Sequence, residues 1–245
     1  MRTIDLNADV GEGHDDLEIF PFVTSVSIAC GAHAGDEATM ERSVIEAVRL
    51  GVAIGAHPSY PDREGYGRRH IEIARDDLKA SLVEQLAMLA SVAARHSARL
   101  THVKPHGALY NEASDDEDLA RVVVDAIRSF EPAIALMALA GSALVSVASA
   151  LGSRVIPEGF ADRRYRPDGR LAARDIDGAV IDDPIAAAEQ AVNLALGRPV
   201  EAIDGTPVRL EAATICIHSD TPDAANVARA VRRELERCGV VVAPR

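Results

Sequence analysis

Short apolar segments alternate with amphipathic helical segments along almost the whole sequence, and this alternation limits the possible folds more than any other feature. The segments that predict strands are residues 3–8, 25–29, 51–56, 100–104, 133–139, 153–157, 213–218 and 239–243. Such alternation predicts a parallel sheet, either open and doubly wound or closed into a barrel. No linker rich in proline, serine or glycine divides the 245 residues, so we expect a single domain over residues 1–245.

Several helices have recognisable start signals. Ser114 with Glu117 forms a capping-box pattern, and Asp183-Pro184 and Thr221-Pro222 each place a capping residue before a proline. The position of Asp36 in the sequence has two interpretations. It precedes an amphipathic run that ends at Gly51, as a helix cap does, but it also closes the segment SIACGAHAGD, where little side-chain bulk surrounds Cys30 and His33 and a ligand loop is possible.

Composition and charge exclude several classes of partner. The formal net charge of -12 argues against nucleic acid and against an anionic membrane surface, because both would be repelled. Three cysteines without a pairing pattern and a start that lacks signal-peptide features favour the cytoplasm. The uncharged stretch 132–153 is rich in alanine, serine and glycine and contains a Gly-Ser turn, so it predicts a buried strand and a helix rather than a membrane span.

Polar side chains follow most of the predicted strands. They are Asp9, His33, His57, His106, Glu158, Asp162, His218 and Asp220. The carboxyl ends of parallel strands emerge on one face of such folds, so these residues are expected to converge there. A single histidine at such a place is usually a structural residue, but four at strand ends favour a functional site.

Lys104 is one of only two lysines, and it shares strand parity with His106 in HVKPHGALYN. A compact ammonium beside an imidazole in one pocket suits acid-base chemistry. The alternative is a lysine that caps a strand end, with a histidine hydrogen-bonded behind it. Lys79, on a predicted helix surface, shows that scarcity alone does not make a lysine functional.

Two arginine clusters follow strand ends in this acidic chain, one with Arg63, Arg68 and Arg69 and one with Arg163, Arg164, Arg166 and Arg170. Guanidinium groups bind carboxylate or phosphate, although surface ion pairs explain most of the seven equally well. Neither lysine follows a glycine, so a Walker A loop is absent, and GEGHDD lacks the third glycine of a dinucleotide fingerprint. A nucleotide would therefore not be bound by either glycine-rich route.

Six motifs in order, DLNADVGEG, SIACGAHAGD, GAHPSYPDREGYGRR, HVKPHGALYN, EGFADRRY and ICIHSD, closely resemble those of the LamB/YcsF family over essentially the whole chain. The resemblance implies a seven-stranded β/α barrel of the glycoside hydrolase/deacetylase type. It also implies a part in the ATP-dependent opening of 5-oxo-L-proline to L-glutamate, shared with 5-oxoprolinase subunits B and C. ATP would be used by the complex, and a divalent metal is a further possible cofactor.

This resemblance suggests roles for particular residues. Asp9, Asp36, Lys104 and His106 are the catalytic candidates: Lys104 stabilises developing negative charge, and His106 with Asp9 or Asp36 activates water. The substrate-binding candidates are Asn7, His33, His57, Arg63, Tyr110, Asp162, Arg163, His218 and Asp220. Two alternatives stay open, namely a metal-dependent amidohydrolase or deacetylase whose zinc site uses histidines and Asp9, and a protein that binds the lactam without catalysis.

Overall fold

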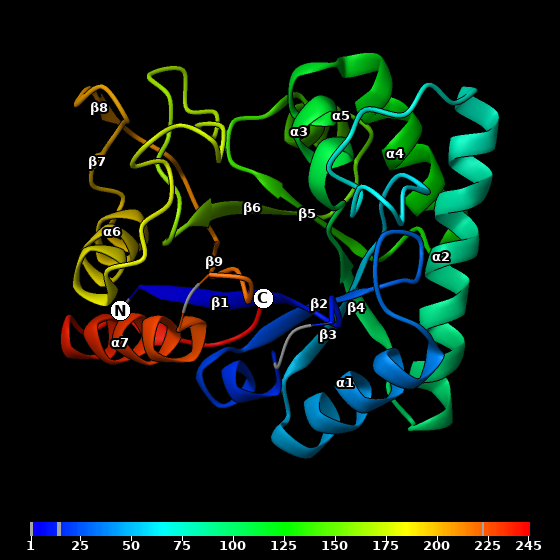
Figure 1. Cartoon of the computed structure of the whole chain (residues 1–245), viewed down its shortest axis with the longest axis horizontal. Helices are drawn as coiled ribbons and strands as arrows, with labels where there is room; N and C mark the ends of the chain where they lie inside the picture. Colours follow the sequence, from blue (N-terminus) through cyan, green and yellow to red (C-terminus); the bar gives the residue numbers. More distant parts are fainter. Residues whose placement is uncertain (1, 14–15, 222) are drawn as a thin grey trace.

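The computed structural model describes residues 2–13, 16–221 and 223–245, and its centre is a closed barrel of parallel strands (Figure 1). Neighbouring strands around the barrel follow chain order from β1 to β6, then β9, which pairs with β1. The strands are β1 (Thr3–Val10), β2 (Ser25–Ala29), β3 (Ala53–His57), β4 (Leu100–Val103), β5 (Ala135–Leu139), β6 (Val155–Phe160) and β9 (Thr214–Cys216). An eighth strand, β10 (Val241–Val242), pairs with the start of β1 outside this ring.

Helices surround the barrel, and α6 and α7 lie beside each other at one side of it (Figure 1). They are the 3₁₀ helix η1 (Asp16–Phe22) and α1 (Glu37–Leu50), α2 (Arg75–Arg95), α3 (Gly107–Asp115), α4 (Glu117–Phe130), α5 (Ala143–Ala150), α6 (Pro184–Leu196) and α7 (Ala224–Arg237). A small hairpin, β7 (Val200–Glu201) with β8 (Pro207–Val208), lies outside the barrel and was not predicted.

The pairing of β1 with β9 decides between the two predicted sheet types. Asp5 is in register with Thr214 and Leu6 with Ile215, so the sheet closes on itself and the seven-stranded barrel is confirmed. The open, doubly wound alternative is wrong. Because the first strand pairs with strands near the end of the chain, we continue to propose a single domain over residues 1–245.

The barrel interior is polar, and the apolar core lies mainly between the barrel and the helices. Along β1, Ile4, Leu6 and Ala8 belong to the apolar core, whereas Asp5 and Asn7 alternate with them. The Asn7 side-chain amide donates to Glu158 Oε1 and to Thr214 Oγ1, both at 2.9 Å. These interior groups are hydrogen-bonded to one another, which allows polar side chains to be buried below the carboxyl ends of the strands.

One glycine of β3 makes room for a buried histidine of β4. A Cβ atom at Gly55 would collide with the His102 ring, so no other residue fits there without moving that ring. His102 is 2% exposed, and its Nε2 lies 3.3 Å from Ser27 Oγ. The absence of a side chain at position 55 therefore allows the His102 ring to occupy the barrel interior beneath Lys104.

The helix starts show which signals were reliable. The caps at Asp36 and Asp183 are confirmed, since their carboxylates accept from Thr39 N and Ala186 N. The capping box at Ser114 is wrong, because α3 continues through Ser114 and Asp116 caps α4 instead. The Thr221-Pro222 start is also wrong for Thr221, since α7 begins at Ala224 after Asp223. Pro222 lies outside the described residues.

The uncharged stretch 132–153 forms strand β5 and helix α5, as the sequence predicted. Of the helices within the described ranges, none combines the length and the apolar character that crossing a membrane requires.

Candidate active site

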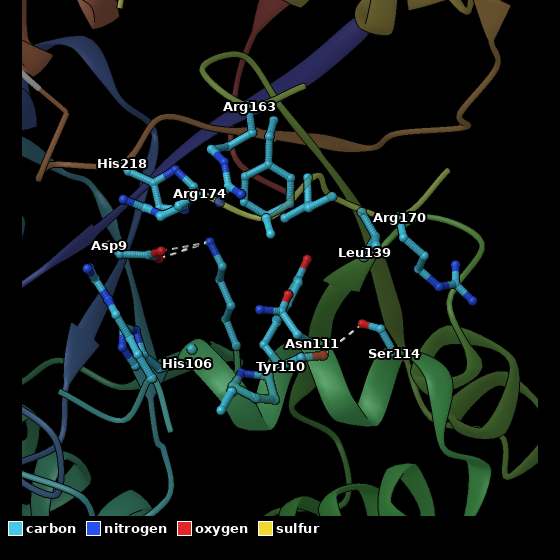
Figure 2. A pocket seen from close by; sticks show the side chains of 18 of the residues that line it. Asp9, His106, Tyr110, Asn111, Ser114, Leu139, Arg163, Arg170, Arg174 and His218 are labelled. Atoms are coloured by element: carbon cyan, nitrogen blue, oxygen red, sulfur yellow. Dashed lines mark hydrogen bonds and ion pairs between the residues drawn. The ribbon is translucent and has the colours of Figure 1, made fainter. Parts of the chain in front are cut away.

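A pocket of about 570 Å³ opens at the carboxyl ends of the strands, a size usual for small-molecule sites. Eight of the thirteen predicted site residues line it. They are Asp9, His57, Lys104, His106, Tyr110, Arg163, His218 and Asp220. They come from β1 and β3 and from the segments that follow β4, β6 and β9, so the predicted convergence of strand ends is confirmed. Figure 2 shows Asp9 and His106 on one side of the pocket and Arg170 on the other.

Lys104 is the most deeply buried cation of the pocket, with 2% of its surface exposed. Its Nζ lies 2.9 Å from Asp9 Oδ1 and 2.8 Å from Glu158 Oε1. Burial opposes a charged ammonium, but Asp9, Cys216 and Glu158 raise the pKa of Lys104 well above its ordinary value. Lys104 is therefore a fixed positive charge and cannot serve as a base.

Asp9 stays ionised despite its burial. Desolvation would raise its pKa, but His57 and Lys104 lower the pKa of Asp9 below its ordinary value. Its Oδ1 atom has no hydrogen bond of good geometry among the described residues, although it is close to the ammonium. Asp9 therefore presents an ionised carboxylate, paired with the Lys104 ammonium, at the pocket wall.

Three histidines gather around Glu12, and we call these four residues the histidine cluster. The rings of His33 and His106 stack with centroids 3.9 Å apart, and His57 meets His106 edge to face. Glu12 Oε1 lies 3.2 Å from His106 Nδ1 and 3.4 Å from His33 Nε2.

Arginines also line the pocket. Arg68 and Arg174 pair with Asp220 at 2.6 and 2.9 Å, which links the segments after β3 and β6 to the segment after β9. Arg163 is 7% exposed and donates to the Ala172 carbonyl, while its Nε has no partner among the described residues. Burial and the nearby Arg174 lower the pKa of Arg163 to about 10, so it remains a cation at neutral pH.

The other predicted site residues contact the side chains that line the pocket, or line it themselves. Asn7 is fully buried beneath Lys104, and His33 lies behind His106. Asp162 accepts from the backbone N–H of His218 at 2.8 Å and lies 3.0 Å from the His218 ring, so it holds that ring in place. Tyr110 lines the pocket and donates to Glu158 Oε2 at 2.7 Å.

Asp36 and Arg63 do not line the pocket. The Asp36 carboxylate is exposed, and it accepts from Thr39 N and Thr39 Oγ1, so it caps α1. Arg63 is exposed and donates to the carbonyls of Gly31 and Gly35, so it stabilises the loop between β2 and α1. Aspartate and arginine occur both in functional sites and in structural roles of this kind, so the sequence could not distinguish the two roles.

Sequence reasoning missed Glu12 and Arg174. Glu12 lies between two glycines with positive φ, Gly11 at 79° and Gly13 at 92°. These glycines turn the chain sharply after β1 and direct Glu12 into the histidine cluster. The acidic residue between the two glycines was the signal in the sequence that could have found this part of the site.

His102, under the pocket, predicts a pH dependence of stability. Burial and the positive charges of Lys104 and Arg154 lower the pKa of His102 to about 3, although Asp9 acts in the opposite direction. A histidine in the unfolded chain titrates near 6.5. Between these values the unfolded state binds the extra proton, so the histidine's contribution is intact above pH 6.5 and is lost as pH falls.

The wild type should therefore lose about 1.5 kcal/mol more than His102→Gln between pH 6.5 and 5. Urea unfolding of both proteins at several pH values measures this difference. Parallel pH curves for the two proteins would show that His102 is not held neutral.

The fold and the pocket together define a β/α-barrel protein with an enzyme-type site at the carboxyl ends of its strands. The chain belongs to the LamB/YcsF family, whose sequence model matches residues 4–245. A relative from Chloroflexus aggregans, named as the A subunit of 5-oxoprolinase, is 46% identical over 99% of this chain and 98% of its own length.

Solved structures support the fold. The lactam utilization protein from Thermus thermophilus has 42% sequence identity and a TM-score of 0.92, with 98% of this chain and 99% of that chain covered. A family 4 carbohydrate esterase from Streptomyces lividans shares only the fold, with 11% identity, a TM-score of 0.52 and coverage of 98% and 91%. The expected glycoside hydrolase/deacetylase type of barrel is confirmed.

Proposed function

We propose that this chain is the A subunit of a 5-oxoprolinase and that it hydrolyses the ring amide of 5-oxo-L-proline to give L-glutamate. The observation that carries the proposal is one pocket lined by two chemically different kinds of side chain. The carboxylates and imidazoles of Asp9, Glu12 and His106 line it together with the guanidinium of Arg163. The relative from Chloroflexus aggregans and the lactam utilization protein direct the choice of substrate.

Arg163 suits the carboxylate of the lactam. Arg163 is buried with an unpartnered Nε–H among the described residues, and a carboxylate can accept from it in a charge-assisted hydrogen bond. The ring amide then lies toward Asp9 and the histidine cluster. Asp9 and the histidine cluster are placed to activate water. The Lys104 ammonium offsets the negative charges of Asp9 and Glu158, so negative charge that develops on the substrate is not repelled by these carboxylates.

Amide hydrolysis of an unstrained lactam is slow unless the carbonyl oxygen is activated, and ATP can supply that activation. Since the chain has no glycine-rich phosphate loop, we propose that subunits B and C perform the phosphoryl transfer and pass the activated lactam to this pocket. ATP is therefore a cofactor of the complex. We also propose a cytoplasmic location, which agrees with three free cysteines, Cys30, Cys216 and Cys238.

Glutamate formation from 5-oxoproline tests the proposal, with this chain alone and with its B and C partners, each with and without ATP. Glutamate only in the complete mixture with ATP is the expected result. Glutamate from this chain alone without ATP would replace the divided mechanism with a self-sufficient amidohydrolase. No glutamate in any mixture would reject the proposed substrate.

Arg163→Gln should raise the KM for 5-oxoproline about 10- to 100-fold while kcat changes much less, because a charge-assisted contact to the substrate is lost. Steady-state kinetics of the complete mixture give both constants. Arg170→Gln is the matched control, since Arg170 lines the same pocket but pairs with Asp115. Equal effects in the two variants would count against a specific carboxylate contact.

A further inference from the structure

The inner nitrogens of His57 and His106 face each other across a short distance. His57 Nδ1 lies 2.7 Å from the Lys104 carbonyl, and His106 Nε2 lies 2.9 Å from the Tyr66 carbonyl. A carbonyl only accepts, so each of these outer nitrogens must carry the hydrogen. In neutral rings the inner nitrogens, His57 Nε2 and His106 Nδ1, are then both acceptors, yet they lie 2.9 Å apart.

Glu12 and His33 add further acceptors at the same place. The Ser59 hydroxyl donates to the Tyr60 carbonyl, so it accepts from His33 Nδ1 at 2.9 Å, which leaves His33 Nε2 without a hydrogen. That atom faces Glu12 Oε1 at 3.4 Å, and the same oxygen lies 3.7 Å from His57 Nε2. Each of these contacts joins two acceptors, an arrangement that a cation between them would stabilise.

The spacing fits a metal ion better than a proton. Ligand atoms about 2.1 Å from a common ion, at angles of roughly 90 to 110°, lie about 3.0 to 3.4 Å apart. The separations among Glu12 Oε1, His57 Nε2 and His106 Nδ1 are 2.9, 3.2 and 3.7 Å. A single proton would satisfy one of these contacts and leave the others unpaired.

We propose that Glu12, His57 and His106 bind one divalent transition-metal ion, with Zn²⁺ as the first choice. Two imidazoles and a carboxylate are a usual zinc set that leaves a coordination position open. The ring N–H bonds to the carbonyls of Lys104 and Tyr66 are the outer contacts that orient metal-binding histidines. His33 lies beside Glu12 and completes the wall of acceptors.

A second group, Asp9 with Cys216 and His218, has a similar spacing but a different occupant. The Lys104 ammonium lies 2.9 Å from Asp9 Oδ1 and 3.2 Å from Cys216 Sγ, and the His218 ring pairs with Asp162. The cation that this group needs is already supplied by the protein. Within the described part of the chain no such ammonium reaches the inner atoms of the histidine cluster, and this contrast identifies the cluster as the metal site.

The binding of the metal does not depend on the substrate, although its role rests on the proposed function. A bound metal would lower the pKa of a water molecule or polarise the lactam carbonyl, beside the Asp9 carboxylate. His57 and His106 would then be ligands, and Asp9 would be left as the base of the pocket.

The test is calorimetric titration of untagged, chelator-treated protein with ZnCl₂, repeated with CoCl₂ while the visible spectrum of Co²⁺ is recorded. One ion per chain is expected. Affinity should fall by at least about 100-fold in Glu12→Gln and in His57→Gln. His96→Gln is the control, because His96 lies at the end of α2 and pairs with Glu41. It should bind as the wild type does.

Circular dichroism verifies that each variant folds, and nitrogen-15 NMR of the wild-type imidazoles provides a second measurement that needs no variant. Metal should shift His57 Nε2 and His106 Nδ1 and leave their partner nitrogens protonated. Absence of binding, equal affinity in the variants, or a proton shared by the two rings that metal does not displace would overturn the proposal. None of these measurements uses 5-oxoproline, so a failed activity assay would not be mistaken for a failed metal site.

Discussion

Replacing Lys104 with methionine is expected to lower the free energy of unfolding by about 3–5 kcal/mol. The ammonium lies between Asp9 and Glu158, all three side chains are buried, and methionine fills a similar volume without the charge. Two buried carboxylates would lose their shared counter-charge. Burial and Asp9 already act to raise the pKa of Glu158, although Lys104 opposes them. Glu158 should therefore take up a proton in the variant.

Lys79→Met is the matched control, because Lys79 is the only other lysine and lies half-buried on the surface of α2. Its effect should stay within about 0.5 kcal/mol. The double variant Lys104→Met/Glu158→Gln should recover part of the loss, since it removes one of the unpaired carboxylates. Urea unfolding measures all three. Wild-type stability of Lys104→Met, or full glutamate production by it, would contradict the central place given to Lys104.

How much the sequence predicted depends on the kind of signal. Alternation of apolar and helical segments predicted all eight parallel strands of the described chain, because both periodicities are local. Closure of the barrel rests on the pairing of β1 with β9, which joins Asp5 to Thr214 across most of the chain, and only the resemblance pointed to it. The hairpin β7–β8 has two residues in each strand, too few for a periodic signal.

The site was predicted in part for the same reason. His57 ends β3, and His106 and His218 come shortly after β4 and β9. Strand ends converge in any parallel barrel, so the meeting of these histidines was predictable. Asp36 looked equally suitable, yet its carboxylate is taken up by the helix that follows. The tautomers of His57, His106 and His33 leave one nitrogen of each ring without a hydrogen on the side of Glu12. These tautomers are set by hydrogen bonds from the other ring nitrogens to the carbonyls of Lys104 and Tyr66 and to the Ser59 hydroxyl. Such three-dimensional hydrogen bonds leave no mark in the order of residues.

Asp9→Asn is expected to reduce glutamate formation in the complete mixture by about 10²- to 10⁴-fold, the usual loss when a general acid-base group is removed. His57 and Lys104 keep the pKa of Asp9 low against the effect of burial, so the wild type presents a carboxylate that asparagine cannot replace. Lys104 keeps its contact with Glu158 in the variant, which should preserve the fold. Initial rates with all subunits present, at saturating 5-oxoproline, measure the effect.

Asp36→Asn separates this prediction from a general effect of lost charge. Asp36 was the other catalytic candidate of the sequence, and asparagine caps helices about as well as aspartate, so both rate and stability should stay close to wild type. Binding of 5-oxoproline to Asp9→Asn distinguishes the remaining alternative. Near-normal binding with lost turnover assigns the chemistry to this chain, because a protein that only carried the lactam would keep its turnover whenever it kept its binding.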